Sequence, residues 1–106
     1  MLILASQSSI RKALLNQAGL RFSAQPAVID ERQLENDAVA IGADGRDVAL
    51  LLAHRKAEAV SQQNPGAYVI GADQTLALGI ELLHKPANLG DARAQLERLR
   101  GKTHRL

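Results

Sequence analysis

The sequence predicts an α/β domain, because short apolar runs of strand length alternate along the chain with longer stretches of helical periodicity. Leu2–Ala5 and Tyr68–Ala72 are the clearest strands, and Asp47–Gln62 is the clearest helix. The chain has 106 residues, of which 46% are hydrophobic and 23% are charged. That length and composition suit one modest domain over residues 1–106 and exclude wholesale disorder.

The composition also excludes several classes of function. Aromatic residues make up 2% of the chain, which is too few to form a stacking platform for single-stranded nucleic acid. The net charge of +2 is too small for a duplex-binding surface. The chain has no cysteine, which rules out disulfides, thiolate metal sites and cysteine nucleophiles.

The apolar run Met1–Ala5 has no basic leader and is only five residues long. It is therefore too short for a signal peptide or a membrane-spanning helix. We expect a cytoplasmic protein with neither a membrane nor a stable nucleic-acid partner.

Leu2–Ala5 is followed by a serine loop and a predicted helix. Ser6–Ser9 supplies candidates for the helix N-cap, and Gly19 stands where a left-handed C-cap belongs. An apolar face is formed by residues at four-residue spacing, namely Ile10, Leu14 and Ala18. A helix N-terminus suits an anion such as phosphate, and Arg11 could add a cationic group. The simpler alternative is that the serines only cap the helix and that Arg11 is solvated.

The next segment begins with a second predicted strand, Arg21–Ala24, which Pro26 ends. Ala27–Arg46 is polar, and we interpret it as a long connection, a kind of segment that is often functional in compact domains. Within it, Asp30 and Glu31 are candidate ligands for a divalent cation. The simpler alternative is that both acids are solvated.

Asp47–Gln62 has the periodicity of a helix with one buried side, formed by Val48, Leu51, Leu52 and Ala59. Lys56 lies one turn beyond Leu52 at the edge of that side, where its ammonium can reach either water or a cleft. Asn64-Pro65-Gly66 ends the helix.

Asp73 is the strongest catalytic candidate, because the buried strand that starts at Tyr68 delivers this carboxylate to its exposed end. Gly71 and Ala72 leave the neighbouring backbone open to a ligand. Gln74 and Thr75 add neutral hydrogen-bonding groups. The simpler alternative is a strand that ends in a polar turn.

The last third of the chain predicts a hairpin over Leu76–Leu83 that turns at Gly79. Pro86 then holds Lys85 out of helical conformation. Asn88–Asp91 is typical of a helix N-terminus, and that helix runs to Gly101. Lys102–Leu106 is expected to start another strand.

Five motifs together resemble the Maf family, the septum-formation-inhibitor-like nucleoside triphosphate pyrophosphatases. They are Leu4–Arg11, the Lys-Ala-Glu-Ala run at Lys56, Ile70–Asp73, Lys85-Pro86 and Gly101–His104, in the family's order and rough spacing. The resemblance implies hydrolysis of a nucleoside triphosphate to the monophosphate and pyrophosphate. It also implies Mg²⁺ or Mn²⁺ as cofactor and a mixed sheet with flanking helices, related to the inosine-triphosphate pyrophosphatases.

The resemblance assigns roles to individual residues of this chain. Asp73 matches the family's proton acceptor, although its own chemistry leaves open whether it orients a water or holds the metal. Glu31 matches an acid near the metal. The residues that match substrate-binding positions are Ser6, Ser8 and Arg11 for phosphate, Lys56 and Lys85 as cleft lysines, and Thr103 and His104 in the last shared motif.

Two positions bear on the choice of base. Many members that resemble dTTP/UTP pyrophosphatases have arginine where this chain has Ile10, and threonine where it has Gln74. A glutamine at position 74 resembles the branch associated with 7-methyl-GTP, whereas Gly101–His104 resembles the other branch. The resemblance therefore leaves the substrate open between these two branches.

Family chains continue well beyond the Thr-His motif, so the resemblance implies that this chain corresponds to their N-terminal part. We expect an uncovered sheet edge and, from it, a homodimer or other self-association. Two alternatives to an enzyme follow. The chain could be a nucleotide-binding module without turnover, or a plain structural fragment in which Arg11, Lys56, Asp73 and Lys85 do not share a cleft.

Overall fold

The computed structural model describes residues 1–106 as an α/β chain in which parallel and antiparallel strand pairs are flanked by four helices. Strands β2, β1 and β3 form a parallel sheet in that order, and β4 and β5 form a separate antiparallel hairpin. The elements are β1 (Leu2–Leu4), α1 (Ser9–Gln17), β2 (Ser23–Ala24), α2 (Glu31–Ala40), α3 (Gly45–Gln63), β3 (Tyr68–Ile70), β4 (Leu76–Leu78), β5 (Glu81–Leu83) and α4 (Leu89–Leu99). The predicted α/β class, with mixed strand directions and flanking helices, is confirmed.

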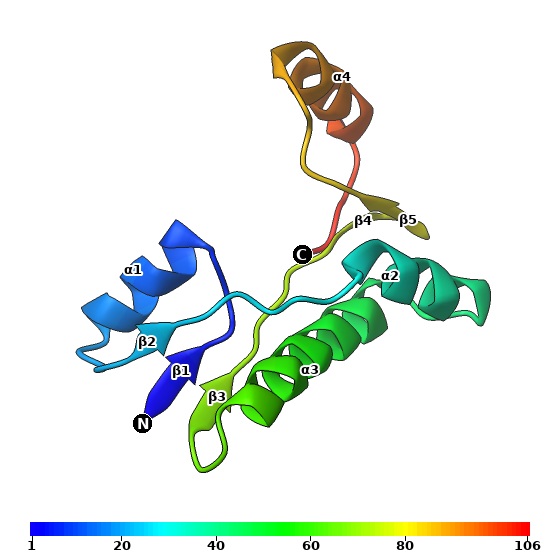
Figure 1. Cartoon of the computed structure of the whole chain (residues 1–106). Coiled ribbons are helices and arrows are strands. Elements are labelled where there is room, and N and C mark those ends of the chain that lie inside the picture. Colours follow the sequence, from blue (N-terminus) through cyan, green and yellow to red (C-terminus); the bar gives the residue numbers. More distant parts are fainter.

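β1 is the middle strand of the parallel sheet, and its residues Ile3 and Leu4 are part of the core. Its residue Ile3 pairs with Ser23 of β2 and Val69 of β3. Ile3 and Ala5 are at most 2% exposed and pack against Val60 of α3, which runs alongside β3 (Figure 1). A continuous apolar run is typical of a parallel strand that is buried on both faces, and Ile3 and Leu4 are both buried.

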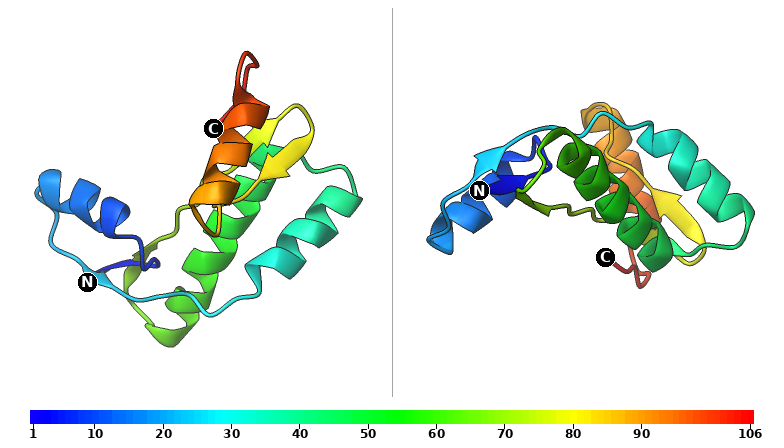
Figure 2. Two further views of the ribbon diagram at one scale, coloured as in Figure 1. Left: turned by 90° about the horizontal axis from the view of Figure 1, so that it is seen from above. Right: turned by 60° about the horizontal axis from the view of Figure 1, so that its bottom comes forward.

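A second apolar cluster joins α2 to α3. Ala38 of α2 packs with Val48 and Leu52 of α3, and Leu34 and Leu82 cover this cluster from the sides. The two helices lie side by side in both views of Figure 2. This contact holds α2 against the N-terminal half of α3.

The presence of α2 shows that the interpretation of residues 27–46 as a long connection was wrong. Asp30 caps the helix by accepting a hydrogen bond from the Gln33 N–H at 3.1 Å. Leu34 and Ala38, four residues apart, form its buried stripe against α3. Only this narrow stripe is apolar, so the segment has little helical periodicity in its hydrophobic residues.

The strand boundaries also differ from the prediction. β2 covers only Ser23–Ala24, and residues 102–106 form no strand beyond one bridge between Arg105 and Ala77. β3 ends at Ile70 and does not reach Asp73. Val69 packs against the cluster that contains Val60 of α3, whereas Tyr68, one residue earlier, points to the opposite face and is 79% exposed. The prediction of a buried strand there was therefore wrong.

Helix α1 begins and ends as predicted, but its apolar face is not covered. Ser8 is the N-cap, and Gly19 has a φ of 75° directly after the C-cap. Ile10 and Leu14 are 72% and 59% exposed, and no residue of α1 is buried. The helix is therefore held mainly by its two ends, where the chain enters from β1 and leaves towards β2.

The remaining elements confirm their predictions with small shifts. α3 begins at Gly45 behind a reciprocal cap between Asp44 and Asp47, and Val60, rather than Ala59, is its buried residue near the end. The hairpin turns at Gly79, and α4 starts after Asn88. Figure 1 shows α4 beyond the hairpin, apart from the parallel sheet. None of the four helices combines the length and apolar character that crossing a bilayer requires.

Candidate active site

A cavity of about 930 Å³ lies between the N-terminal end of α1, the start of α2, the middle of α3 and the segments that flank the hairpin. Its volume is within the range of small-molecule sites. Nearly all of the candidate residues line it, namely Ser6, Ser8, Ile10, Arg11, Glu31, Lys56, Asp73, Gln74 and Lys85.

Arg11, Lys56, Asp73 and Lys85 share this cavity, which contradicts the alternative of a plain structural fragment. Thr103 and His104 do not line it. Both are exposed and follow the turn after α4, in the segment that leads to the bridge between Arg105 and Ala77 of β4.

The centre of the site is an ammonium held between two carboxylates. Lys56 Nζ lies 2.9 Å from Glu31 Oε1 and 3.0 Å from Asp73 Oδ1. The side chains of Lys56 and Asp73 are each only 12% exposed, whereas that of Glu31 is 51% exposed. A nearly buried charge needs such partners, since its solvation by water is largely lost. Asp73 Oδ2 makes no hydrogen bond within the chain and stays available to a ligand or a water.

Gly71 explains how the chain brings Asp73 to Lys56. A Cβ at this position would lie 2.0 Å from the carbonyl oxygen of Ala53 and 2.9 Å from the Cβ of Ala57. Only glycine therefore allows the segment after β3 to pass this close to α3. Lys56 belongs to the same turns of α3, so the close approach sets the contact between Lys56 and Asp73.

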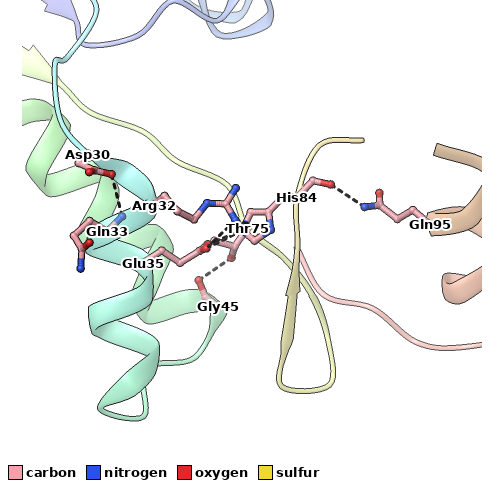
Figure 3. Close-up of polar contacts among 8 residues, drawn as sticks. All are labelled: Asp30, Arg32, Gln33, Glu35, Gly45, Thr75, His84 and Gln95. Carbon is pink, nitrogen blue, oxygen red and sulfur yellow. Dashed lines mark hydrogen bonds and ion pairs between the residues drawn. The ribbon is translucent and has the colours of Figure 1, made fainter. Parts of the chain in front are cut away.

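The segment after Asp73 is anchored at the N-terminal end of α3. The Thr75 hydroxyl donates to the carbonyl oxygen of Gly45 at 2.7 Å, a bond drawn in Figure 3. Asp73 and Gln74 are thus held between two contacts with the same helix.

The N-terminal end of α1 supplies backbone donors to the cavity. Ser8 Oγ accepts from the Arg11 N–H at 3.2 Å, and Ser6 Oγ accepts from the Ser8 N–H at 3.0 Å. The N–H groups of Ser9 and Ile10 have no partner within the helix, as expected for its first turn. Ser6 is 8% exposed, so its hydroxyl is buried and stabilises the loop through this hydrogen bond to Ser8.

Two further cations face the cavity without a partner. The side chains of Arg11 and Lys85 form no ion pair within the chain. They lie with the α1 amides around a site that also contains two carboxylates. Unpaired cations beside free backbone donors are suited to a ligand that carries several negative charges.

A family model described as Maf-like protein matches residues 1–106. The chain belongs to the Maf-like family. It is 53% identical over 105 residues to a 7-methyl-GTP pyrophosphatase of Brucella abortus, which covers 99% of this chain and 53% of the relative. It is 56% identical over 105 residues to a nucleoside triphosphate pyrophosphatase of Bradyrhizobium diazoefficiens, which covers 99% of this chain and 51% of the relative. The chain thus spans about half the length of the curated relatives it matches.

Sequence reasoning missed one polar cluster of this Maf-like chain. Glu35 of α2, 8% exposed, contacts the ring of His84, which also meets Arg32 (Figure 3). Glu35 follows Glu31 by four residues, the spacing that places two residues on one helix face. That spacing indicates a shared face only if residues 31–40 are helical, and the apolar residues of this segment show little helical periodicity.

Proposed function

We propose that this Maf-like protein hydrolyses a nucleoside triphosphate to the nucleoside monophosphate and pyrophosphate, and that the chain described here carries the triphosphate-binding part of the site. The observation that carries the proposal is the shared cavity of Arg11, Lys56, Asp73 and Lys85. The names of the relatives, 7-methyl-GTP pyrophosphatase and nucleoside triphosphate pyrophosphatase, support the same reaction.

The cations and amides around the cavity fit the charge of a triphosphate. Arg11 and the free N–H group of Ile10 would bind one end of the triphosphate, and Lys85 the other. Each charge-assisted hydrogen bond of this kind contributes about 1.5–3 kcal/mol. Several such bonds are needed, because a bound triphosphate loses most of its contact with water.

Asp73 would act as the base that activates the attacking water. The water oxygen forms a bond to the α-phosphorus, the bond between that phosphorus and the bridging oxygen to the β-phosphate breaks, and pyrophosphate leaves. The proton lost by the water passes to the Asp73 carboxylate. Its free Oδ2 is the atom available for this role, because Oδ1 is held by Lys56 at 3.0 Å.

We also propose that Mg²⁺ or Mn²⁺ binds with Glu31 and Asp73 as its protein ligands. Lys56 Nζ lies 2.9 Å from Glu31 Oε1 and 3.0 Å from Asp73 Oδ1, so the two carboxylates lie close together, and a cation that binds both would take the place of this ammonium. The chain has no group of three or more histidine or acidic residues that could hold a metal by itself. Two carboxylates with phosphate oxygens are a usual ligand set for Mg²⁺. Such a cation would offset phosphate charge and polarise the phosphoryl oxygens.

We propose 7-methyl-GTP as the substrate to test first, because several of the relatives carry that name. Ile10 and Gln74 both line the cavity and are exposed, so they can contact a base. The Gln74 amide offers a donor and an acceptor to a base edge, and Ile10 offers an apolar contact.

The experiment is a measurement of pyrophosphate release from 7-methyl-GTP, GTP, dTTP and UTP, with Mg²⁺, with Mn²⁺ and after chelation of divalent cations. We expect turnover that requires a divalent cation and favours 7-methyl-GTP. Release of inorganic phosphate in place of pyrophosphate would contradict the proposed reaction. Unchanged rates after chelation would contradict the proposed metal.

Nucleotide binding without turnover is the second candidate for the 106-residue chain. The observation that favours it is the contact of Lys56 with Asp73 Oδ1 at 3.0 Å, which leaves only Oδ2 for the attacking water. The position of Thr103 and His104 outside the cavity supports the same candidate. Calorimetric binding of α,β-methylene-GTP by a chain that releases no pyrophosphate would favour this candidate.

A further inference from the structure

Glu35 is the only charged residue of the chain that is buried, with 8% of its surface exposed. Its two carboxylate oxygens lie 2.7 and 3.0 Å from His84 Nε2. Figure 3 shows this side chain reaching from α2 to the residue that follows β5. A buried carboxylate is costly unless it is paired, and the His84 ring is its nearest partner, whereas Arg32 Nη1 lies 3.9 Å from Glu35 Oε2.

The contacts of the His84 ring determine which nitrogen carries the proton. Arg32 Nη1 lies 3.3 Å from His84 Nδ1. A guanidinium can only donate, so Nδ1 must accept, and the proton is on Nε2, directed at Glu35. Both ring nitrogens are therefore engaged by α2, and the imidazole is fixed in one orientation.

The backbone of His84 is held from the other side. Its carbonyl oxygen accepts a hydrogen bond from Gln95 Nε2 of α4 at 2.8 Å (Figure 3). Lys85 is the next residue, and Pro86 restricts the conformation that Lys85 can adopt. The direction of the Lys85 side chain into the cavity thus depends on how residue 84 is held.

The same helix carries Glu31 one turn before Glu35. The contact between Glu35 and His84 therefore joins the wall of the cavity that contains Glu31 to the wall that contains Lys85. The contact between Glu35 and His84 thus holds the two walls at a set distance from each other. A triphosphate would have to lie between these walls.

We propose that Glu35 and His84 are positioning residues that hold Lys85 at a fixed place in the cavity, opposite Glu31. The consequence for nucleotide binding rests on the function proposed above. The competing explanation is a pair that only stabilises the fold, and it predicts that loss of Glu35 leaves the order of Lys85 unchanged.

The first test measures the affinity of α,β-methylene-GTP with Mg²⁺ by calorimetry. We expect Glu35→Ala to weaken binding about tenfold, the lower end of the effect of residues that orient a functional group. Asp37→Ala is the matched control, because this acid of α2 bonds only to Gln33 of the same helix. In a Lys85→Ala background, Glu35→Ala should weaken binding no further. An equal loss in both backgrounds would overturn the proposal.

The second test does not depend on a nucleotide. Backbone ¹⁵N relaxation should show the Lys85 amide to be ordered in the wild-type chain and mobile in Glu35→Ala. Glu35→Gln should restore the order, because its amide oxygen can accept the same Nε2 proton. If Lys85 is as ordered in Glu35→Ala as in the wild type, the proposal is wrong. If the order changes but the wild type binds no nucleotide, the proposed function fails and the positioning role stands.

Discussion

At the residue scale, Lys56 is the group on which the site depends most. Its ammonium is the single cation within 3.0 Å of both Glu31 and Asp73. Removing it would leave two carboxylates facing each other, one of them nearly buried, without a partner. Lys56 therefore has a structural role in the free protein in addition to any contact with phosphate.

We predict that Lys56→Met lowers the free energy of unfolding by about 1–3 kcal/mol, the usual cost of leaving a buried polar group unpaired. The matched control is Lys12→Met on α1, because Lys12 is also partly buried but has no ion pair. Urea unfolding of both variants measures the difference. Equal losses in the two variants would show that the ion pairs of Lys56 contribute nothing.

Gly71 allows a second prediction at this scale. Gly71→Ala places a Cβ 2.0 Å from the Ala53 carbonyl oxygen, so the segment must move away from α3. We expect the free energy of unfolding to fall by about 1–3 kcal/mol, as at other overpacked sites. We also expect the contact between Asp73 and Lys56 to weaken. Gly90→Ala is the control, because its new Cβ meets only the Asn88 side chain, at 3.2 Å. Thermal unfolding compares them, and equal stability would contradict the close approach.

At the element scale, the helix caps explain how the long helix α3 begins where it does. The pKa of Asp44 is held below its ordinary value of 3.8, chiefly because its carboxylate accepts the Asp47 N–H, at 2.9 Å. A lowered pKa means that the charged cap stabilises the fold above the ordinary pKa, and that this contribution is lost as the pH falls through the lower value of the folded state.

We therefore predict that wild type and Asp44→Asn differ in unfolding free energy by a constant amount above about pH 5, and that this difference shrinks as the pH falls below 3.8. The asparagine keeps an acceptor for the Asp47 N–H but does not titrate. Urea unfolding over a pH series provides the measurement. A difference that is independent of pH would contradict the charged cap.

The elements also show what the sequence could and could not predict. α3 and the hairpin were predictable because their turns have strong local signals, Asn64-Pro65-Gly66 and Gly79. α2 was not, because its apolar stripe is narrow and becomes meaningful only against Val48 of α3. The contact of Glu35 with His84 joins residues 49 positions apart, and no local pattern encodes that pairing.

The candidate site likewise combines residues whose position was predictable with residues whose position was not. Lys56 and Asp73 were found through motifs, and the structure brings them to 3.0 Å. Thr103 and His104 belonged to an equally good motif, but the chain places them outside the cavity. A motif predicts which residues are functional, but it does not predict where they lie. The distance of Thr103 and His104 from the cavity depends on how α4 packs against the rest of the chain.

At the scale of the whole molecule, the chain is more extended than its length requires. Its radius of gyration is 15.6 Å, against about 13 Å for a compact domain of this length. Only 11 of its 106 residues are buried, and Ile10, Leu14 and Leu96 are among the large apolar side chains left exposed. A small core and exposed apolar residues favour association.

We therefore predict that the isolated chain self-associates, with an average mass that rises with concentration. Leu14→Glu should lower that mass, because it places a charge on the exposed face of α1, whereas Gln17→Glu at the end of the same helix should not. Sedimentation equilibrium measures both. A monomer mass at every concentration, together with cooperative unfolding, would contradict the prediction.

The most direct measurement is the rate of pyrophosphate release from 7-methyl-GTP with Mg²⁺ by the wild type, Asp73→Asn and Asp37→Asn. Asp37 is the matched acid, because it is exposed and lies outside the cavity. If Asp73 is the base, Asp73→Asn should lower the rate about 100- to 10,000-fold, and Asp37→Asn should leave it unchanged. An Asp73→Asn variant as active as the wild type would contradict the assignment of this cavity as the active site.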